Sequence, residues 1–219
     1  ANSIQVDVDG DTILVSEPHP EFEQQAFLQA LAKYQRNSPF IRVLNDNVPL
    51  VLLLQVIKKL NDDPEYNGAG ISKLEIPLIL YWKDNDSEAL YQRIKQLREE
   101  HSYNPSWEIV TEICRDEIME GTDVERDDKS IMVDYPDEFI RKMRLTGLIS
   151  LRGAGRFIDI NKNEIEKVEY VLEHYSTYPT FETEKEYFNY MAETDENLIS
   201  LETKTLSIDE NDKLLLKWV

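Results

Sequence analysis

The chain has 219 residues, 43 of them acidic and 24 basic, so its formal net charge at neutral pH is -19. Hydrophobic residues make up 41% and aromatic residues 10%, a composition that favours a globular protein over a disordered one. The single cysteine, Cys114, excludes an internal disulfide and a cysteine-rich metal site. The sequence shows neither a secretory signal nor an apolar run of membrane-spanning length, which predicts a cytoplasmic protein with no membrane partner.

The N-terminal residues are expected to precede the main domain. Residues 4–15 alternate apolar and polar side chains around Asp9-Gly10, a pattern that predicts a β-hairpin. An isolated hairpin is marginally stable in water, so residues 1–20 are interpreted as the trailing hairpin of an upstream subdomain that the chain lacks. A helix is expected at Glu21–Gln35, within a helical connector that covers residues 21–47.

The main domain is expected at residues 48–178, and it opens with an apolar helix. Asn47 provides a side chain that can cap this helix, and Pro49 suits its first turn. The apolar run Leu50–Leu60 then predicts the helix with which the core begins.

A capping-box sequence, Ser72-Lys73-Leu74-Glu75, predicts the start of a second helix after a polar loop. Pro77 lies at the fifth position of this helix, where it would remove one backbone hydrogen bond and kink the helix. A buried strand over residues 74–82 is the alternative that the apolar run leaves open.

Two further helices are indicated by apolar residues at helical spacing. The first extends from Ser87 to His101, with Leu90, Ile94 and Leu97 on one face. The second begins at Asn104-Pro105 and carries Trp107, Val110, Cys114 and Ile118. A charged loop is expected to follow at Glu120–Ser130.

A local reversal of charge marks residues 139–158. This stretch holds five basic residues and no acid, in a chain that is strongly acidic overall. The five basic residues are Arg141, Lys142, Arg144, Arg152 and Arg156. Asp134 as a cap and Pro136 in the first turn predict a helix, which Gly147 ends because glycine takes the left-handed conformation without a steric penalty.

The same stretch continues as a predicted hairpin. Strand-like runs at Ile149–Arg152 and Arg156–Ile160 flank the short sequence Gly153-Ala154-Gly155. A helix followed by a hairpin, both positively charged, is the layout of a winged-helix DNA-binding domain. The expected fold class is therefore mostly α with small β-hairpins, containing a winged-helix-like recognition domain (helix-turn-helix plus wing).

The C-terminal part begins with a predicted helix at Asn163–Tyr175. Its inward positions are Ile165, Val168, Leu172 and Tyr175, and its outward positions are Glu164, Glu166, Glu169 and Glu173. One more helix is predicted around Glu184–Met191, and a polar tail is expected after it.

Three sequence pieces, in the same order, resemble the AlwI-type restriction endonucleases, whose relatives include nicking enzymes. They are Val48-Pro49-Leu50 with Lys58-Lys59-Leu60, then Gly70-Ile71-Ser72-Lys73-Leu74-Glu75-Ile76, then Phe139 with Arg144-Leu145-Thr146-Gly147-Leu148-Ile149. The resemblance covers residues 48–175, with looser similarity at Phe181-Glu182-Thr183. The combination of pieces is more specific than any one of them.

The resemblance implies that this region recognises a short asymmetric site in double-stranded DNA, while a separate C-terminal domain cuts a few bases outside it. The chain is then the recognition region of a type II (IIS-like) restriction or nicking endonuclease, and the fragment itself is expected to be non-catalytic. Residues 179–219 are interpreted as a linker towards a missing nuclease domain. The resemblance implies Mg²⁺ for the parent nuclease and no cofactor for the fragment. The missing domain, or a second subunit of the parent enzyme, is a further expected partner.

One alternative makes the chain a metal-dependent nuclease in its own right. Such nucleases commonly hold a divalent metal with an acid on one strand and Glu-x-Lys on the next, and Asp195, Glu202 and Lys204 have this spacing. In a chain with 43 acids the same triple also arises by chance. The three histidines are too far apart in sequence for a local metal-binding motif, and Cys114 lies on an apolar face, which favours a core thiol over a nucleophile.

The expected mechanism of this chain is DNA binding by its five basic residues. Arg141 and Arg144 share a helix face and would reach guanine edges or phosphates in the major groove, with Lys142 on a phosphate. Arg152 and Arg156 flank the hairpin tip and would follow the DNA backbone or enter the minor groove. They lie nearly opposite each other if residues 153–155 form the whole loop, whereas a different register would let them splay apart. Two other interpretations remain: a solvated patch paired with neighbouring acids, and a winged-helix protein-interaction module that binds an acidic partner.

Overall fold

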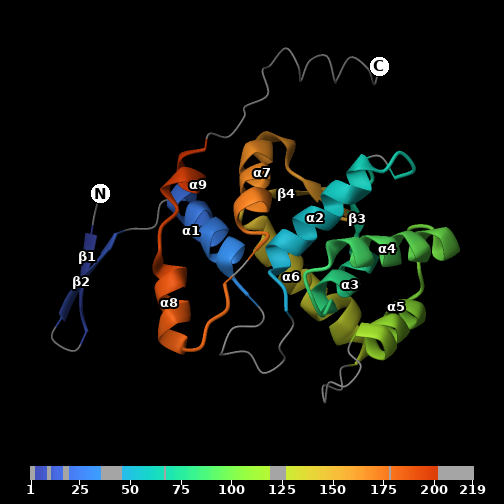
Figure 1. The fold of residues 1–219 in the computed structure, drawn as a ribbon, viewed down its shortest axis with the longest axis horizontal. Coiled ribbons are helices and arrows are strands. Elements are labelled where there is room, and N and C mark those ends of the chain that lie inside the picture. The colour runs from blue at the N-terminus through green and yellow to red at the C-terminus, as the bar shows by residue number, and fades with distance from the viewer. Residues whose placement is uncertain are drawn as a thin grey trace, which may run out of the picture.

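Helices dominate the computed structural model of the chain (Figure 1). The structure describes residues 3–8, 11–16, 20–35, 46–66, 68–118, 127–177 and 179–201. Beside the helices lie a two-stranded hairpin and a separate three-stranded antiparallel sheet. The prediction of a mostly helical chain with small β-hairpins is therefore confirmed. No helix in the described ranges is long and apolar enough to cross a membrane.

The N-terminal hairpin forms where the alternation predicted it. β1 (Ser3–Val8) and β2 (Asp11–Ser16) pair antiparallel, with Val8 opposite Asp11 across the turn. The next element, α1 (Pro20–Lys33), corresponds to the helix expected at residues 21–35.

The central helix is α2 (Pro49–Asp62), which is buried along most of its length and packs against α1, α4 and α7 (Figure 1). Pro49 occupies the first turn as expected, but the cap was predicted wrongly. The Asn47 amide donates instead to the carbonyl of Trp82, at 2.6 Å, while the Asn85 side chain accepts the N–H of Val48, at 3.1 Å. The start of α2 is therefore tied to the segment that follows α3.

The capping box is present and begins a short helical turn, η1 (Lys73–Glu75), directly after β3 (Ile71–Ser72). α3 (Ile76–Tyr81) continues from this turn, and every one of its residues is buried. Because α3 begins anew after η1, Pro77 lies in its first turn, where a missing N–H has no cost. The alternative strand is wrong, and Pro77 lies at the start of a new helix rather than at the fifth position of one that begins at the capping box.

α4 (Ser87–His101) has the predicted bounds, with the Asp86 carboxylate as its cap, and it buries Leu90, Ile94 and Leu97. α5 (Trp107–Ile113) and the π-helical turn η2 (Cys114–Ile118) follow. Val110, Cys114 and Ile118 are buried as predicted. Trp107 is 44% exposed, because it is the first residue of α5 and precedes the part that packs inward.

The helix that carries the basic stretch begins earlier than predicted. The chain is already helical at Asp128, so the end of the expected charged loop is wrong; residues 119–126 lie outside the described part. A π-helical turn, η3 (Ser130–Asp134), leads without a break into α6 (Tyr135–Arg144). Asp134 makes no capping hydrogen bond; Asp127 does, accepting the N–H of Ser130 at 2.8 Å.

A turn at residues 145–148 connects α6 to the second hairpin, and Gly147 has the expected positive φ of 79°. β4 (Ile149–Arg152) and β5 (Phe157–Ile160) pair antiparallel, and β3 pairs with the other edge of β5, giving the order β3-β5-β4. Arg152 lies opposite Phe157 rather than opposite Arg156. The β4–β5 turn therefore comprises residues 153–156, so the structure has the alternative register and the two arginines do not face each other.

The C-terminal helices pack on the rest of the molecule (Figure 1). After the turn η4 (Lys162–Glu164) come α7 (Ile165–His174), α8 (Glu184–Ala192) and α9 (Glu196–Ser200). Glu164, predicted to face outward, is only 5% exposed and forms an ion pair with Lys167 at 2.7 Å. The Lys33 ammonium of α1 donates to the carbonyls of Tyr190 and Glu193, so α8 is held against α1.

Asp63, just after α2, offers a test of the α2–α4 contact through pH. It accepts hydrogen bonds from the Tyr91 hydroxyl at 2.5 Å and from the Lys95 ammonium at 2.9 Å, and these lower the pKa of Asp63 from 3.8 to about 2. A carboxylate with a lowered folded-state pKa stabilises the fold fully above its unfolded pKa, and the contribution is lost as the pH falls towards the folded value. We expect Asp63→Asn to be less stable than the parent at about pH 6, and this difference to shrink between about pH 4 and about pH 2.

Urea unfolding of both proteins across this range measures the difference directly. Asp62→Asn, a change at the exposed neighbouring carboxylate, is the matched control. A stability difference that stays constant from about pH 6 to about pH 2 would contradict the assignment of these hydrogen bonds to an ionised Asp63.

Candidate nucleic-acid interface

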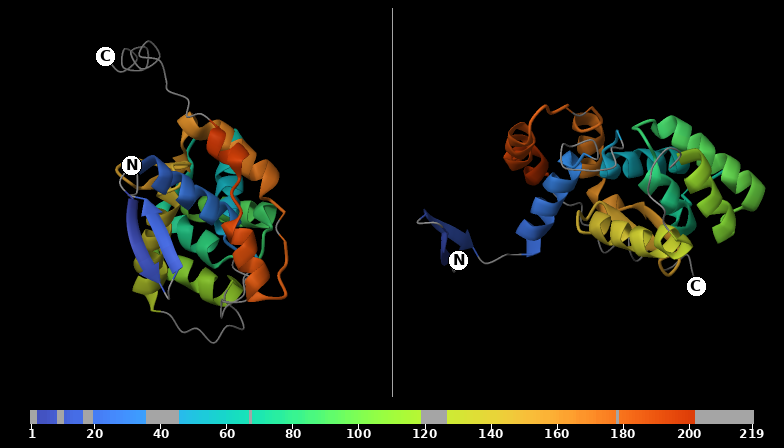
Figure 2. Two further views of the ribbon diagram at one scale, coloured as in Figure 1. Left: turned by 90° about the vertical axis from the view of Figure 1, so that its left-hand side faces the viewer. Right: turned by 90° about the horizontal axis from the view of Figure 1, so that it is seen from below.

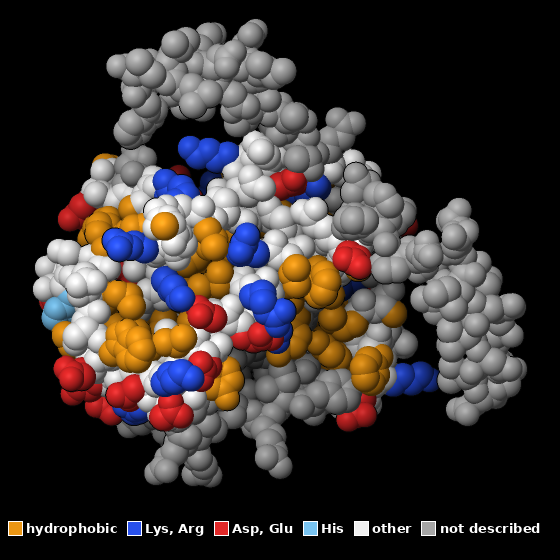
Figure 3. All heavy atoms as spheres, turned by 180° about the vertical axis from the view of Figure 1, so that it is seen from behind, with side chains coloured by type: hydrophobic (Ala, Val, Ile, Leu, Met, Phe, Trp, Pro, Cys, Tyr) orange, Lys and Arg blue, Asp and Glu red, His pale blue; other side chains and the backbone are white. Residues whose placement is uncertain are grey.

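α6 presents a face with exposed cations. This face lies on the side turned away from the viewer in Figure 1, as the right-hand view of Figure 2, seen from below, shows. Lys and Arg side chains gather on that side, interspersed with acidic and apolar ones (Figure 3). Phe139, Ile140 and Met143 turn inward and anchor the helix. Arg141, Lys142 and Arg144 therefore point outward, as the sequence predicted.

Two of these three cations already have a carboxylate partner on the same helix. Glu138 forms ion pairs with Arg141 at 2.6 Å and Lys142 at 3.1 Å. Hydrogen bonds from Arg141 and then Lys142 lower the pKa of Glu138. All three side chains are substantially exposed, so each pair is weak. The paired interpretation raised from the sequence therefore holds for Arg141 and Lys142.

Arg144 and Arg156 differ from the other basic residues of the stretch. Both are exposed, and neither guanidinium has an ion-pair partner among the described residues. Arg144 ends α6, and Arg156 ends the β4–β5 turn. Within the basic stretch, these two are therefore the cations most available to an anionic ligand.

Arg152 holds the β4–β5 hairpin in place. Its guanidinium forms an ion pair with Asp159 at 2.6 Å and donates to the carbonyl of Gly68. Asp159 is nearly buried, and its other oxygen accepts the amide N–H of Asn61 at 2.7 Å. The side chain of Arg152 therefore links β4 to β5 and to the loop after α2, and Asp159 links the pair to Asn61 in α2. The sequence prediction did not include these structural contacts.

A buried ion pair supports the opposite edge of the sheet. Arg98 of α4 makes two hydrogen bonds to Glu75, both at 2.7 Å, and a third to the carbonyl of Gly70 at 2.7 Å. Its guanidinium also lies over the rings of Tyr66 and Tyr103, at 5.0 and 4.7 Å. Glu75 is the same residue that completes the capping box. One buried arginine thus fixes β3, η1 and α4 relative to each other.

The candidate nuclease triple is only partly within the described residues. Asp195 caps α9 and accepts hydrogen bonds from the hydroxyls of Tyr170, at 3.1 Å, and Tyr175, at 2.6 Å. Glu202 and Lys204 lie outside the described part. Within it, no group of three or more His, Cys, Asp or Glu side chains could hold a metal ion.

Cys114 is a core thiol. Its side chain is fully buried, and this burial raises the pKa of the thiol to about 12, so the nucleophilic thiolate is strongly disfavoured.

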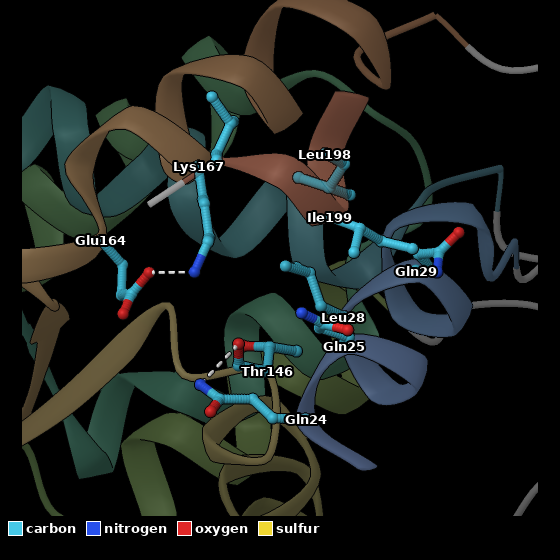
Figure 4. A pocket seen from close by; sticks show the side chains of 10 residues that line it. Gln24, Gln25, Leu28, Gln29, Thr146, Glu164, Lys167, Leu198 and Ile199 are labelled. Atoms are coloured by element: carbon cyan, nitrogen blue, oxygen red, sulfur yellow. Dashed lines mark hydrogen bonds and ion pairs between the residues drawn. The ribbon is translucent and has the colours of Figure 1, made fainter. Parts of the chain in front are cut away.

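A polar cavity of about 330 Å³ lies between α1, α7 and α9 (Figure 4). The polar groups that line it largely satisfy each other. Glu164 pairs with Lys167, Gln24 donates to the carbonyl of Thr146, and Gln29 accepts the N–H of Asp195. The cavity thus lies at the junction that attaches α1 and α9 to the domain.

The sequence could not indicate which cations remain unpaired in the fold. The two ion pairs of Glu138 could have been predicted from the sequence, because Glu138 stands three residues before Arg141 and four before Lys142. The Arg152–Asp159 pair crosses between the two strands of one hairpin, and the Arg98–Glu75 pair joins α4 to η1, so neither pair leaves a helical i,i+3 or i,i+4 pattern.

The chain matches one family of DNA-cleaving enzymes over most of its length. A family profile described as AlwI restriction endonuclease matches residues 10–214. The fold and its basic face thus occur in a protein of the restriction endonuclease class. Enzymes of this class are nucleases that bind and hydrolyse DNA in restriction–modification systems. The chain belongs to the AlwI restriction endonuclease family. No curated protein matches it. The matched region is longer than the resemblance at residues 48–175 and includes β2, α1, α8 and α9.

Proposed function

We propose that this chain is the sequence-recognition part of a type IIS-like restriction or nicking endonuclease. It binds double-stranded DNA with α6 and the β4–β5 turn. Mg²⁺ serves the cleavage step of the parent enzyme, whereas the mechanism of this chain is binding.

The order of the elements supports a winged-helix arrangement. α6 runs directly into the β4–β5 hairpin, and the earlier strand β3 completes the sheet in the order β3-β5-β4. α2 and α3 flank β3 in sequence, while α4 and α5 form an insertion before α6. In this arrangement α6 takes the place of the recognition helix, and the β4–β5 turn takes the place of the wing.

The observation that carries the proposal is the pair of unpaired arginines at the ends of these two elements. An arginine on the exposed side of a recognition helix can bind guanine bidentately, so we assign Arg144 to a base edge. An arginine at a wing positions the protein on phosphates, so we assign Arg156 to the backbone. Arg152 contributes by holding the hairpin and by adding charge near the backbone.

Glu138 has a defined role in this proposal. It neutralises Arg141 and Lys142 in the free protein and would repel phosphates that approach α6. Arg141 must break its ion pair with Glu138 before it contacts a base edge or a phosphate. Lys142 must likewise leave Glu138 before it contacts a phosphate. Together with the net charge of -19, this disfavours non-specific binding. Binding is expected only where the DNA site compensates for the repulsion.

Selection of duplexes from a random library, followed by titrations with Arg144→Gln, tests the function. We expect Arg144→Gln to cost about 1–3 kcal/mol on the selected sequence and little on random duplexes, as loss of a base contact does. Arg141→Gln should cost less, because Arg141 must first leave Glu138. Lys185→Gln, at an exposed lysine of α8, is the control.

Failure to enrich any duplex, together with tight binding of an acidic protein that depends on Arg144, would replace this function with the protein-interaction alternative. If Arg144→Gln lowers affinity equally on selected and random duplexes, Arg144 contacts the DNA backbone and not a base edge.

A further inference from the structure

A second concave surface lies beside the β4–β5 turn, on the side of β3. Its three walls are the start of η1, the loop between α4 and α5, and the turn itself. The lining residues are Ser72, Lys73, Leu74, Tyr103, Asn104, Ala154, Gly155, Arg156 and Phe157, and the cavity measures about 690 Å³. We call it the β3–turn cleft.

The charge of this cleft is unusual for the molecule. Two cations, Lys73 and Arg156, line it, and no carboxylate does, although the chain has 43 acids and 24 bases. Two other cavities each contain a lysine paired with a glutamate: Lys167 with Glu164, and Lys142 with Glu138.

The two cations of the cleft are not equally available. Lys73 reaches out of the lining to Asp137, at 2.6 Å, in an exposed pair. Arg156 has no ion pair among the described residues. The cleft is thus a positively charged cavity whose principal cation is Arg156.

The walls of the cleft are held at a fixed separation. Ser72 lies opposite Phe157 in the β3–β5 ladder, and the N–H of Lys73 donates to the carbonyl of Arg156 at 2.8 Å. The two cationic residues therefore belong to chain segments that are hydrogen-bonded to each other.

The floor of the cleft is aromatic and rigidly supported. The rings of Tyr103 and Phe157 meet edge to face, with centroids 5.5 Å apart. The Arg98 guanidinium covers Tyr103 at 4.7 Å, and Arg98 is itself fixed by Glu75. Beside the ring, Asn104 places an exposed side-chain amide at the rim.

We propose that the β3–turn cleft binds the sugar–phosphate backbone of one DNA strand, next to the base pairs that α6 contacts. Arg156 and Lys73 bind the phosphate, the Asn104 amide donates to it, and a deoxyribose packs on the Tyr103–Phe157 floor. The proposal rests on the proposed function and assigns to it Lys73, Tyr103 and Asn104, which lie outside the basic stretch.

Two substitutions change the charge of the cleft from opposite walls. Arg156→Gln removes the unpaired cation, and Asn104→Asp adds a carboxylate at an exposed loop position. Asn104→Ala removes the amide without adding charge, and Lys185→Gln removes a cation from α8, which does not line the cleft. The probe is a duplex selected from a random library, with random duplexes for comparison.

We expect Arg156→Gln to lower the slope of log affinity against log salt by about one, and to weaken binding about eightfold at about 0.1 M salt, equally on all sequences. Asn104→Asp should weaken binding at least as much, and Asn104→Ala less. With single methylphosphonates, which remove one phosphate charge each, the parent should lose affinity at one or two positions of one strand. Arg156→Gln should lose less affinity than the parent at those positions, because only Lys73 and Asn104 still contact the phosphate there.

The results separate this inference from the proposed function. One outcome would overturn this inference alone. In it, the parent selects a sequence and Arg144→Gln relaxes that selection, while Arg156→Gln and Asn104→Asp bind DNA as well as Lys185→Gln does. The cleft then does not bind the DNA backbone, and the recognition function stands. If the parent binds no duplex, both are wrong. If an acidic peptide binds and Asn104→Asp abolishes its binding while duplex affinity is unchanged, the cleft is a peptide site.

Discussion

Replacing Arg98 with alanine should destabilise the fold by about 3–5 kcal/mol, the range for breaking a buried ion pair from one side. Arg98 is 4% exposed and Glu75 is fully buried. Without the guanidinium, the Glu75 carboxylate retains the N–H of Ser72 as its one remaining hydrogen-bond donor among those described. The carbonyl of Gly70 also loses its donor. Urea unfolding monitored by tryptophan fluorescence measures the loss.

A matched surface pair provides the control for this prediction. Arg93 also makes two hydrogen bonds to one carboxylate, that of Glu117, both at 2.8 Å, but Glu117 is 49% exposed. Arg93→Ala should cost less than about 1 kcal/mol, because an exposed pair stays solvated. The double substitution Glu75→Leu, Arg98→Met should be more stable than Arg98→Ala alone, since it leaves no buried charge. Equal losses for Arg93→Ala and Arg98→Ala would show that burial does not set the strength of this interaction.

Gly70→Ala should be the second severe substitution, with a loss of about 2–4 kcal/mol. Gly70 has a φ of 68°, and a methyl group there would lie 2.5 Å from the carbonyl oxygen of Ile158. That oxygen is backbone of β5, so relief of the clash requires the β3–β5 ladder to move. The substitution therefore combines a left-handed backbone with a clash that no side-chain rotation removes.

Gly68→Ala separates the two contributions. Gly68 has nearly the same φ, 72°, but a methyl group there meets nothing within 4 Å. It should cost about 1–2 kcal/mol, the penalty of the left-handed conformation alone. Chemical denaturation of both variants gives the comparison. A loss at Gly70 no larger than that at Gly68 would mean that the sheet yields easily at this position.

Local sequence patterns predicted most of the helices and the second hairpin. α4 has the predicted bounds because its apolar residues recur at helical spacing through the whole segment, and the structure caps it there with the Asp86 carboxylate. The start of the helix that leads into α6 was missed because Asp134 and Pro136 resemble a helix start. The chain instead passes through a π-helical turn before Pro136, and Asp127 is the cap.

Tertiary packing decided the remaining differences. Glu164 has the sequence environment of an exposed glutamate, but it is buried beside Lys167 in the junction with α1 and α9. The α1 side of this junction is more than a hundred residues away in sequence, so periodicity within α7 could not reveal the burial of Glu164.

The charge pattern of the sequence indicated the candidate site, but it did not indicate which of the basic residues form ion pairs. The reversal of charge at residues 139–158 led to α6 and the β4–β5 hairpin as the candidate elements, because side-chain charge is visible in any sequence. Which cations stay free depends on contacts such as Arg152 with Asp159, which follow from the register of the hairpin. A shift of register by one residue would have placed that aspartate on the other face.

The middle position of β5 in its sheet affects how the protein meets a ligand. Both edges of β5 are paired, one with β3 and one with β4, so the hairpin cannot swing outward without breaking the sheet. The conformational entropy of ordering the turn is therefore lost when the chain folds and not when it binds. Surface geometry at the turn is set in advance, so a ligand must adapt to the protein more than the protein adapts to the ligand. For a polymer as stiff as duplex DNA, this favours sequences whose own shape already fits.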